Sequence, residues 1–165
     1  MRKLLLCVAV GLAGCSSGQE TGPPQARARL IDANGQPAGE LSLYSLTEGT
    51  RVVGDLPNLP AGAHGFHFHA TGSCQPPGFE SAGAHFNPTN RQHGFQNSNG
   101  PHLGDMPNVS TSRVNLVVQG LQLAALADAD GAAIVLHANP DDLRTDPSGN
   151  SGARIRCGVV ERLAQ

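Results

Sequence analysis

The sequence lacks tryptophan and contains one tyrosine and a single lysine, whereas glycine and proline are abundant, with 21 and 12 residues. This mixture favours many short strands and turns over long helices. The formal net charge of -2 provides no surface suited to polyanions, so nucleic acid is not an expected partner. A length of 165 residues corresponds to one ordinary domain.

The N-terminal segment has a composition of its own. Arg2 and Lys3 precede an apolar run over residues 4–12, and small residues lead from this run to Cys15. The run is much shorter than the roughly 20 residues that span a bilayer, so residues 1–14 are expected to be a secretory signal peptide and not a transmembrane anchor. The last four residues up to Cys15 also resemble a bacterial lipobox. That motif predicts a lipid on Cys15 and an exported protein, anchored to a membrane in the periplasm or cell envelope. Ordinary cleavage nearby, without lipidation, is the alternative.

Residues 15–25 are small, polar and proline-containing, which predicts a flexible tether ahead of a domain over residues 26–165. Cys7 leaves with the signal peptide and Cys15 takes the lipid, so Cys74 and Cys157 remain. Two cysteines in an oxidising compartment are expected to form a disulfide. Metal binding by two thiolates is the weaker alternative, because the histidines already form a complete ligand set.

Alternating apolar and polar residues between turn signals predict about eight short strands: residues 26–31, 40–46, 50–56, 65–69, 113–118, 122–126, 132–137 and 155–160. Two long irregular loops, residues 70–109 and 141–152, separate some of them. Short strands with turns at this spacing predict an all-β fold, an antiparallel β-barrel or sandwich. A loop as long as the first fits a compact domain only if something constrains it, such as a metal ion and a disulfide.

Six of the seven histidines lie where metal binding would need them. His67 and His69 are two residues apart on a strand, so they share one face while Phe66 and Phe68 take the other. The phenylalanines can therefore fill the core while the imidazoles converge outside it. The seventh histidine, His64, falls on the phenylalanine side and is expected to be a hydrogen-bonded structural residue.

The first irregular loop carries three further histidines and a carboxylate: His85, His93, His102 and Asp105. Three His and one Asp form a closed, all-protein shell suited to structural Zn²⁺. Such an ion would order a loop without a strand partner, since its binding free energy becomes folding free energy. The sixth of these histidines, His137, ends a strand that could lie beside the strand of His67 and His69.

These residues stand in motifs that closely resemble the copper–zinc superoxide dismutase family. The motifs are residues 64–69, 81–88, 93–94, 101–105, 136–137, 141–143 and 149–159. The resemblance covers nearly all of residues 26–160 and implies a Greek-key arrangement of the strands. It also implies an enzyme that converts superoxide to oxygen and hydrogen peroxide.

The resemblance further implies how the site is divided. Copper would be held by His67, His69, His85 and His137, and zinc by His85, His93, His102 and Asp105, with His85 bridging the two ions. His85 would also take up and return a proton during the reaction. The Asp141 carboxylate would join His67 to His93, and the Arg154 guanidinium would stand beside copper to guide superoxide.

Some properties depart from the better-known members of the family. Residues 143–148 look shorter and contain no lysine, and the positive charge of Arg144 is opposed by Asp146. Bacterial members associate in several ways, so the choice between monomer and homodimer stays open. Two other functions compete with the enzyme: a non-enzymatic copper- or zinc-binding envelope lipoprotein, and an adhesive sandwich domain. A non-enzymatic descendant would be expected to lose Arg154 or a copper ligand, and the sequence retains them all.

Overall fold

The computed structural model describes residues 22–128 and 130–164. The strands are β1 (Ala26–Asp32), β2 (Pro37–Ser45), β3 (Gly49–Asp55), β4 (Phe66–His69), β5 (Arg113–Gln119), β6 (Ala133–His137) and β7 (Arg154–Arg162). Two short 3₁₀ helices, η1 (Glu80–Ala82) and η2 (Leu123–Leu126), complete the elements of this part of the chain. The strand predicted at residues 122–126 is wrong. Leu123 and Leu126 are buried on one side of a single helical turn, a spacing that a short apolar run does not distinguish from a strand.

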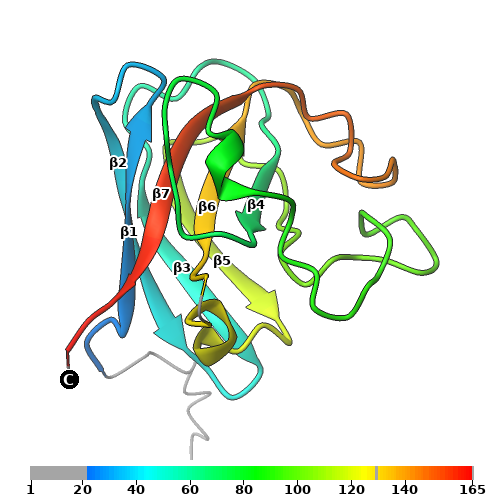
Figure 1. Ribbon diagram of the computed structural model, residues 1–165, viewed down its shortest axis with the longest axis horizontal. Coiled ribbons are helices and arrows are strands. Elements are labelled where there is room, and N and C mark those ends of the chain that lie inside the picture. Colours follow the sequence, from blue (N-terminus) through cyan, green and yellow to red (C-terminus); the bar gives the residue numbers. More distant parts are fainter. Residues whose placement is uncertain (1–21, 129, 165) are drawn as a thin grey trace, which may run out of the picture.

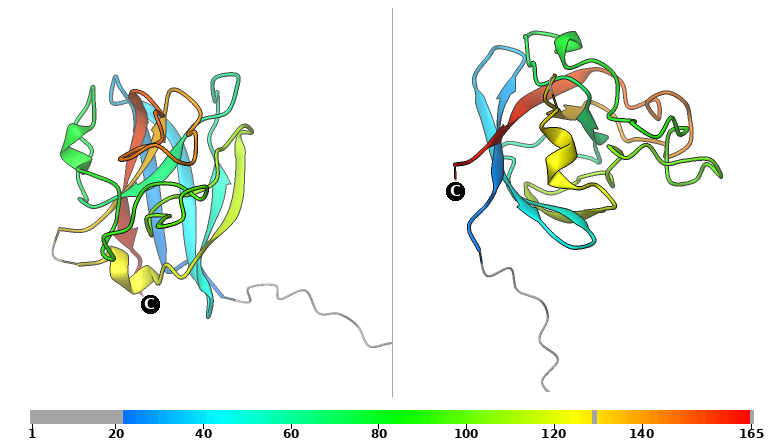
Figure 2. Two further views of the ribbon diagram at one scale, coloured as in Figure 1. Left: turned by 90° about the vertical axis from the view of Figure 1, so that its right-hand side faces the viewer. Right: turned by 60° about the horizontal axis from the view of Figure 1, so that its bottom comes forward.

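The strands form one antiparallel sheet in the order β4-β6-β7-β1-β2-β3-β5. The sheet curls into a half-barrel (Figures 1 and 2). Because β4 and β5 are the two edges, the chain crosses from β3 at one side to β4 at the other and then returns. The all-β antiparallel fold predicted from the sequence is confirmed, with seven described strands in place of about eight.

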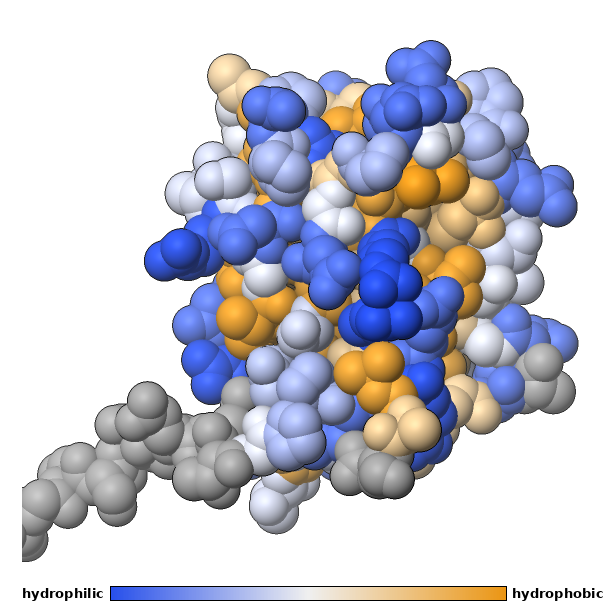
Figure 3. Space-filling model, turned by 90° about the vertical axis from the view of Figure 1, so that its left-hand side faces the viewer, coloured by the Kyte–Doolittle hydropathy of each residue, from blue (hydrophilic) through white to orange (hydrophobic). Residues whose placement is uncertain are grey.

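The core fills the concave side of the sheet. Phe66 and Phe68 are completely buried there, together with Leu41 and Leu43 of β2 and Ile134 of β6. The opposite face of β1, β2 and β7 is largely hydrophilic, with smaller hydrophobic areas between the polar side chains (Figure 3). No helix in the described ranges is long and apolar enough to cross a membrane.

Two long loops lie beside the edge formed by β4 and β6 (Figure 1). The first runs between β4 and β5 and contains η1, and the second joins β6 to β7. Main-chain hydrogen bonds of 2.8 Å tie the first loop to β4: Phe68 N–H donates to Gly104 O, and Phe86 N–H donates to Phe68 O. These bonds help to fix the loop histidines beside the sheet.

The predicted disulfide between Cys74 and Cys157 is confirmed and fastens the first loop to β7. The two cysteines are 83 residues apart, so the bond removes about 4 to 5 kcal/mol of unfolded-chain entropy as an upper figure. A second, smaller core cluster of Phe79, Ala82, Ala133, Val135 and Cys157 packs beneath it. This cluster holds η1 against the sheet, next to the site.

Candidate metal centre

Four imidazoles, here called the histidine quartet, converge on the loop side of the sheet: His67, His69, His85 and His137. Strand β4 carries two of them, and pairing of β4 with β6 brings His137 to the same end. His69 also forms an isolated β-bridge with His85, which draws the loop residue in. The four potential ligand atoms lie within 4.8 Å of one another, and all four residues are buried.

Each ring of the quartet presents one nitrogen with no hydrogen-bond partner. These are Nδ1 of His67 and Nε2 of His69, His85 and His137. Buried polar atoms are rarely left unpaired, so four such nitrogens in one place indicate a ligand-binding site. A metal ion that accepts imidazole lone pairs, such as copper, fits this donor set.

The other nitrogens of the three strand histidines have acceptors that fix the rings. Nε2 of His67 lies 2.8 Å from Asp141 Oδ2. Nδ1 of His69 lies 2.9 Å from the Gly83 carbonyl, and Nδ1 of His137 lies 3.1 Å from the Gly152 carbonyl. When the second nitrogen of each ring donates to these oxygens, the first is left with its lone pair toward the centre. Metal-binding histidines are oriented in this way.

The second group, here called the mixed cluster, consists of His85, His93, His102 and Asp105. Oδ1 of Asp105 lies 3.0 Å from His85 Nδ1, 3.2 Å from His93 Nδ1 and 3.3 Å from His102 Nδ1. A tetrahedral zinc site with bonds of about 2.0 Å has ligand–ligand edges of about 3.3 Å. The mixed cluster therefore has the donor types and the spacing for one zinc ion.

The remaining oxygen of Asp105 is used by the backbone. Its Oδ2 accepts hydrogen bonds of 2.9 Å from the N–H groups of Gly94 and His102. Asp105 is fully buried, and burial alone would raise the pKa of its carboxyl. The hydrogen bonds to the three histidines and to Gly94 outweigh burial and hold the pKa well below its usual range. The carboxylate is thus ionised and directed at the cluster centre.

Asp141 lies between the two groups. Its Oδ2 faces Nε2 of His67 at 2.8 Å, and both its oxygens face Nε2 of His93 at 3.0 Å. The Asn108 side chain bonds the backbone of Asp141 twice, at 2.8 Å each. Sequence reasoning selected Asp141 but missed Asn108, which lies in a stretch without any periodic pattern and so gave no signal.

Burial changes the protonation of the quartet. Loss of hydration, the largest cause, lowers the pKa of His69 to about 2, of His137 to about 3 and of His85 to about 4. These rings are neutral at ordinary pH, which is the form that binds metals. Burial acts on His93 in the same direction, but its hydrogen bonds to Asp105 and Asp141 raise its pKa to about 9. In the metal-free protein a proton on His93 balances part of the negative charge of Asp105 and Asp141, which a zinc ion would otherwise balance.

The seventh histidine is outside both groups. His64 Nδ1 lies 2.9 Å from the His137 carbonyl, and its Nε2 lies 3.1 Å from the Pro60 carbonyl. It is buried and both its ring nitrogens face carbonyl oxygens, as expected for a hydrogen-bonded structural residue.

Arg154 stands at the edge of the quartet in a fixed orientation. Its Nη1 donates to the Phe79 carbonyl and its Nη2 to the Gly83 carbonyl, both at 2.7 Å. Phe79 is a buried residue with a positive φ of 58°, a conformation that the second core cluster holds in place. These bonds use two of the five guanidinium N–H donors.

An opening leads to the quartet from solvent. This access pocket is lined by His69, Glu80, Gly83, Ala84, His85, His137, Pro147, Ser148, Gly152 and Arg154. Arg144 and Asp146 of the second loop do not line this access pocket. Arg144 donates to Gln96 Oε1 at 2.9 Å, while Asp146 accepts the His93 backbone N–H at 2.5 Å. Arg154 is therefore the one lysine- or arginine-type cation among the lining residues.

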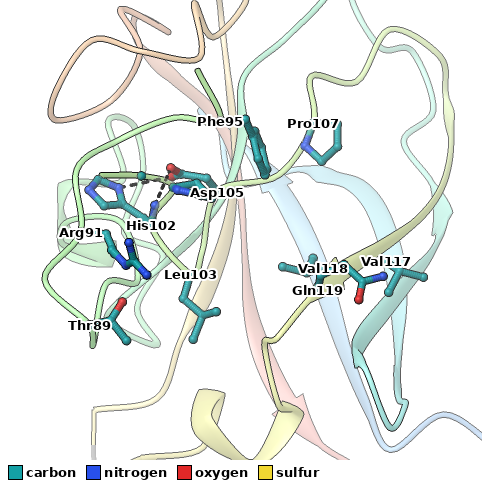
Figure 4. A pocket seen from close by; sticks show the side chains of 12 residues that line it. Thr89, Arg91, Phe95, His102, Leu103, Asp105, Pro107, Val117, Val118 and Gln119 are labelled. Carbon is teal, nitrogen blue, oxygen red and sulfur yellow. Dashed lines mark hydrogen bonds and ion pairs between the residues drawn. The ribbon is translucent and has the colours of Figure 1, made fainter. Parts of the chain in front are cut away.

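A second, mostly apolar pocket lies on the far side of the mixed cluster. His102 and Asp105 border one side, Val117 and Val118 of β5 the other, and the half-exposed ring of Phe95 lies between them (Figure 4). None of the quartet lines this second pocket, whereas three of its four histidines line the access pocket.

The histidine quartet and the mixed cluster share the imidazole of His85 and lie beside one antiparallel half-barrel. This arrangement is that of an all-β metalloprotein with sites for two neighbouring ions. The chain belongs to the copper/zinc superoxide dismutase family, whose sequence model, described as copper/zinc superoxide dismutase (SODC), matches residues 38–160. Copper and zinc are the metals of this family, and the two clusters could hold them.

Individual relatives agree with this membership. The chain is 40% identical over 147 residues to Cu-Zn superoxide dismutase 2 of Aquifex aeolicus, which covers 82% of this chain and 86% of that protein. It is 34% identical over 174 residues to the Cu-Zn superoxide dismutase of Caulobacter vibrioides, with 98% and 100% covered. The crystal structure of a superoxide dismutase-like protein from Bacillus subtilis superposes with a TM-score of 0.73 at 38% identity, covering 81% of this chain and 96% of that chain. The family predicted from the sequence motifs is confirmed.

Proposed function

We propose that this protein converts two superoxide anions and two protons into oxygen and hydrogen peroxide. Copper would be held by the histidine quartet and zinc by the mixed cluster, with His85 shared between them. The observation that carries this proposal is the geometry of His85. Its Nε2 is an unpaired buried atom of the quartet, while its Nδ1 lies 3.0 Å from the carboxylate of the mixed cluster.

The metals and the protein have different tasks in this proposal. Copper, when bound, supplies a one-electron redox couple, whereas zinc has no accessible second oxidation state. The protein supplies anion binding and proton handling. His85 lines the access pocket, so its Nε2 can hold a proton there and release it to a reduced oxygen species.

Arg154 would bind and orient the substrate. A guanidinium stays charged at any useful pH and offers a fork of donors to a small anion. The carbonyls of Phe79 and Gly83 hold the fork at the wall of the access pocket. Because Gly83 O also lies 2.9 Å from His69 Nδ1, one carbonyl fixes both the anion-binding residue and a ring of the quartet.

Metal analysis combined with a superoxide-decay assay on the purified protein tests the proposal. Asp105→Ala should weaken zinc while copper still binds, and His137→Ala should abolish dismutation with the fold largely intact, since each residue belongs to one cluster. Equal loss of both metals from both variants would contradict separate sites.

A metal-binding protein without catalysis is the second candidate, because one similar solved structure is described only as superoxide dismutase-like. The access pocket and the fixed Arg154 favour the enzyme, since a metal store needs neither. The same assay distinguishes the two functions: a protein that binds both metals but leaves superoxide decay unchanged is a store.

We also propose export to the cell envelope with a lipid on Cys15. Residues 1–21, which include the predicted signal peptide and most of the predicted tether, lie outside the described residues. The Cys74–Cys157 disulfide supports an oxidising compartment. Cys15→Ser should move the protein from the membrane fraction to the soluble fraction, and an unchanged distribution would favour a simple cleaved signal.

A further inference from the structure

One carboxylate shares the access pocket with Arg154. Glu80 opens the short helix η1, directly after Phe79, whose carbonyl binds the guanidinium. Glu80 and Arg154 also line an adjoining depression, with Gly152 common to both. The two charges therefore stand together where the two depressions meet, in front of the quartet.

Glu80 does not form an ion pair with Arg154. Within residues 22–128 and 130–164, the ion pairs up to 4.0 Å do not include these two side chains. The Glu80 carboxylate instead lies over Gly78, where a Cβ would approach Oε1 and Oε2 too closely. Burial lowers the pKa of Arg154, and the negative charge of Glu80 acts against that change, so the two groups interact through space. Glu80 is exposed, and its charge is free to act on whatever enters.

We propose that Glu80 selects anions by charge at the access pocket, favouring monoanions over dianions. The inference rests on the proposed function, because superoxide is a monoanion. An anion that approaches Arg154 also approaches Glu80, and the repulsion grows in proportion to its charge. Glu80 thus slows superoxide to some extent but excludes doubly charged anions, such as sulfate, from the guanidinium more strongly.

The size of the effect follows from Coulomb's law. For a separation on the order of 8 Å in water, one unit charge changes the binding of a monoanion about two- to threefold and that of a dianion about five- to sixfold. Screening reduces both effects at physiological ionic strength, where the Debye length is about 8 Å. The test therefore belongs at low salt, repeated at high salt.

Glu80→Gln removes the charge with little change in shape, and Glu48→Gln is the matched control. Glu48 is also exposed, and it lies in the β2–β3 turn, directly before Gly49 of β3. That turn is at the end of the sheet where Arg162 pairs with Ala26, whereas Arg154 begins β7 at the other end. Both variants change the net charge equally, so only position differs.

Two measurements are made on the metal-loaded proteins. The first is superoxide decay by stopped flow, where Glu80→Gln should be about two- to threefold faster at low salt. The second is the affinity for azide, a monoanion, and for sulfate, a dianion, followed by nuclear magnetic resonance of the Arg154 side chain in the reduced protein. Glu80→Gln should strengthen azide about two- to threefold and sulfate about five- to sixfold. Glu48→Gln should change neither.

The outcomes separate this inference from the proposed function. Equal strengthening of azide and sulfate, no strengthening at all, or the same change in Glu48→Gln would overturn the role of Glu80, even in an active dismutase. A protein without dismutation whose Glu80→Gln variant still gains sulfate affinity over azide would retain the role of Glu80 and lose the proposed function.

Discussion

Asp141→Asn is a demanding test of the site, because this carboxylate touches one ring from each cluster. In the native protein it lies 2.8 Å from His67 Nε2 and 3.0 Å from His93 Nε2, and it accepts the Leu143 N–H at 2.6 Å. An asparagine side chain has a similar shape but one acceptor oxygen, and its NH₂ group faces a donor. At least one of the three donors, a ring N–H or the Leu143 N–H, then loses its acceptor.

The magnitude follows from that loss. An unsatisfied buried donor costs about 1 to 3 kcal/mol, and hydrogen bonds to a charged acceptor are about twice as strong as neutral ones. We therefore expect the metal-free variant to lose about 2 to 4 kcal/mol of unfolding free energy in urea titrations. Loss of a ring-orienting carboxylate lowers metal affinity about 10- to 100-fold. Since Asp141 orients His67 and His93, both copper and zinc affinities should fall by such a factor.

Competition with chromophoric chelators measures the two affinities, and Asp55→Asn is the control. Asp55 is an exposed carboxylate whose partner Arg113 is 3.8 Å away, and such pairs contribute little. If Asp141→Asn weakened one metal only, or neither, the carboxylate would not be the shared orienting group and the reasoning would be refuted.

Three further predictions concern acid, backbone and charge. The metal-free protein should lose stability in urea titrations as pH falls from about 6 toward 4, by roughly 1 kcal/mol per pH unit for each of His69, His85 and His137. The reason is that the unfolded chain takes up protons that the folded chain refuses, and a flat profile would contradict the burial of these rings in the neutral form. Gly149→Ala should destabilise the protein more than Gly35→Ala: both have positive φ, but a Cβ at Gly149 would meet Asp141 Oδ1, whereas the space beside Gly35 is open. Arg154→Ala should leave both metals bound yet lower the rate constant for superoxide decay and its dependence on salt, with Arg154→Lys in between.

The sequence alone determined the fold class and which side chains of the strand over residues 66–69 face the core. Alternation along residues 66–69 placed Phe66 and Phe68 in the core and His67 and His69 on the opposite face, because successive side chains of a strand must point to opposite sides. Local chemistry also singled out the loop histidines and the remaining cysteine pair. It failed at residues 122–126, where a short apolar run fits a helical turn as well as a strand.

The family resemblance anticipated Asp141 beside His67 and His93, but the tertiary structure decided how the site residues are held. His67 finds its acceptor on Asp141, 74 residues away, and Arg154 finds its carbonyls on Phe79 and Gly83, 75 and 71 residues away. Asn108, which fixes Asp141, carries no signal in its own neighbourhood. A sequence pattern reports side-chain type and the direction of a side chain within its own element. The free nitrogen of an imidazole depends on which distant oxygen reaches the other nitrogen, and that is set only when the loops pack on the sheet.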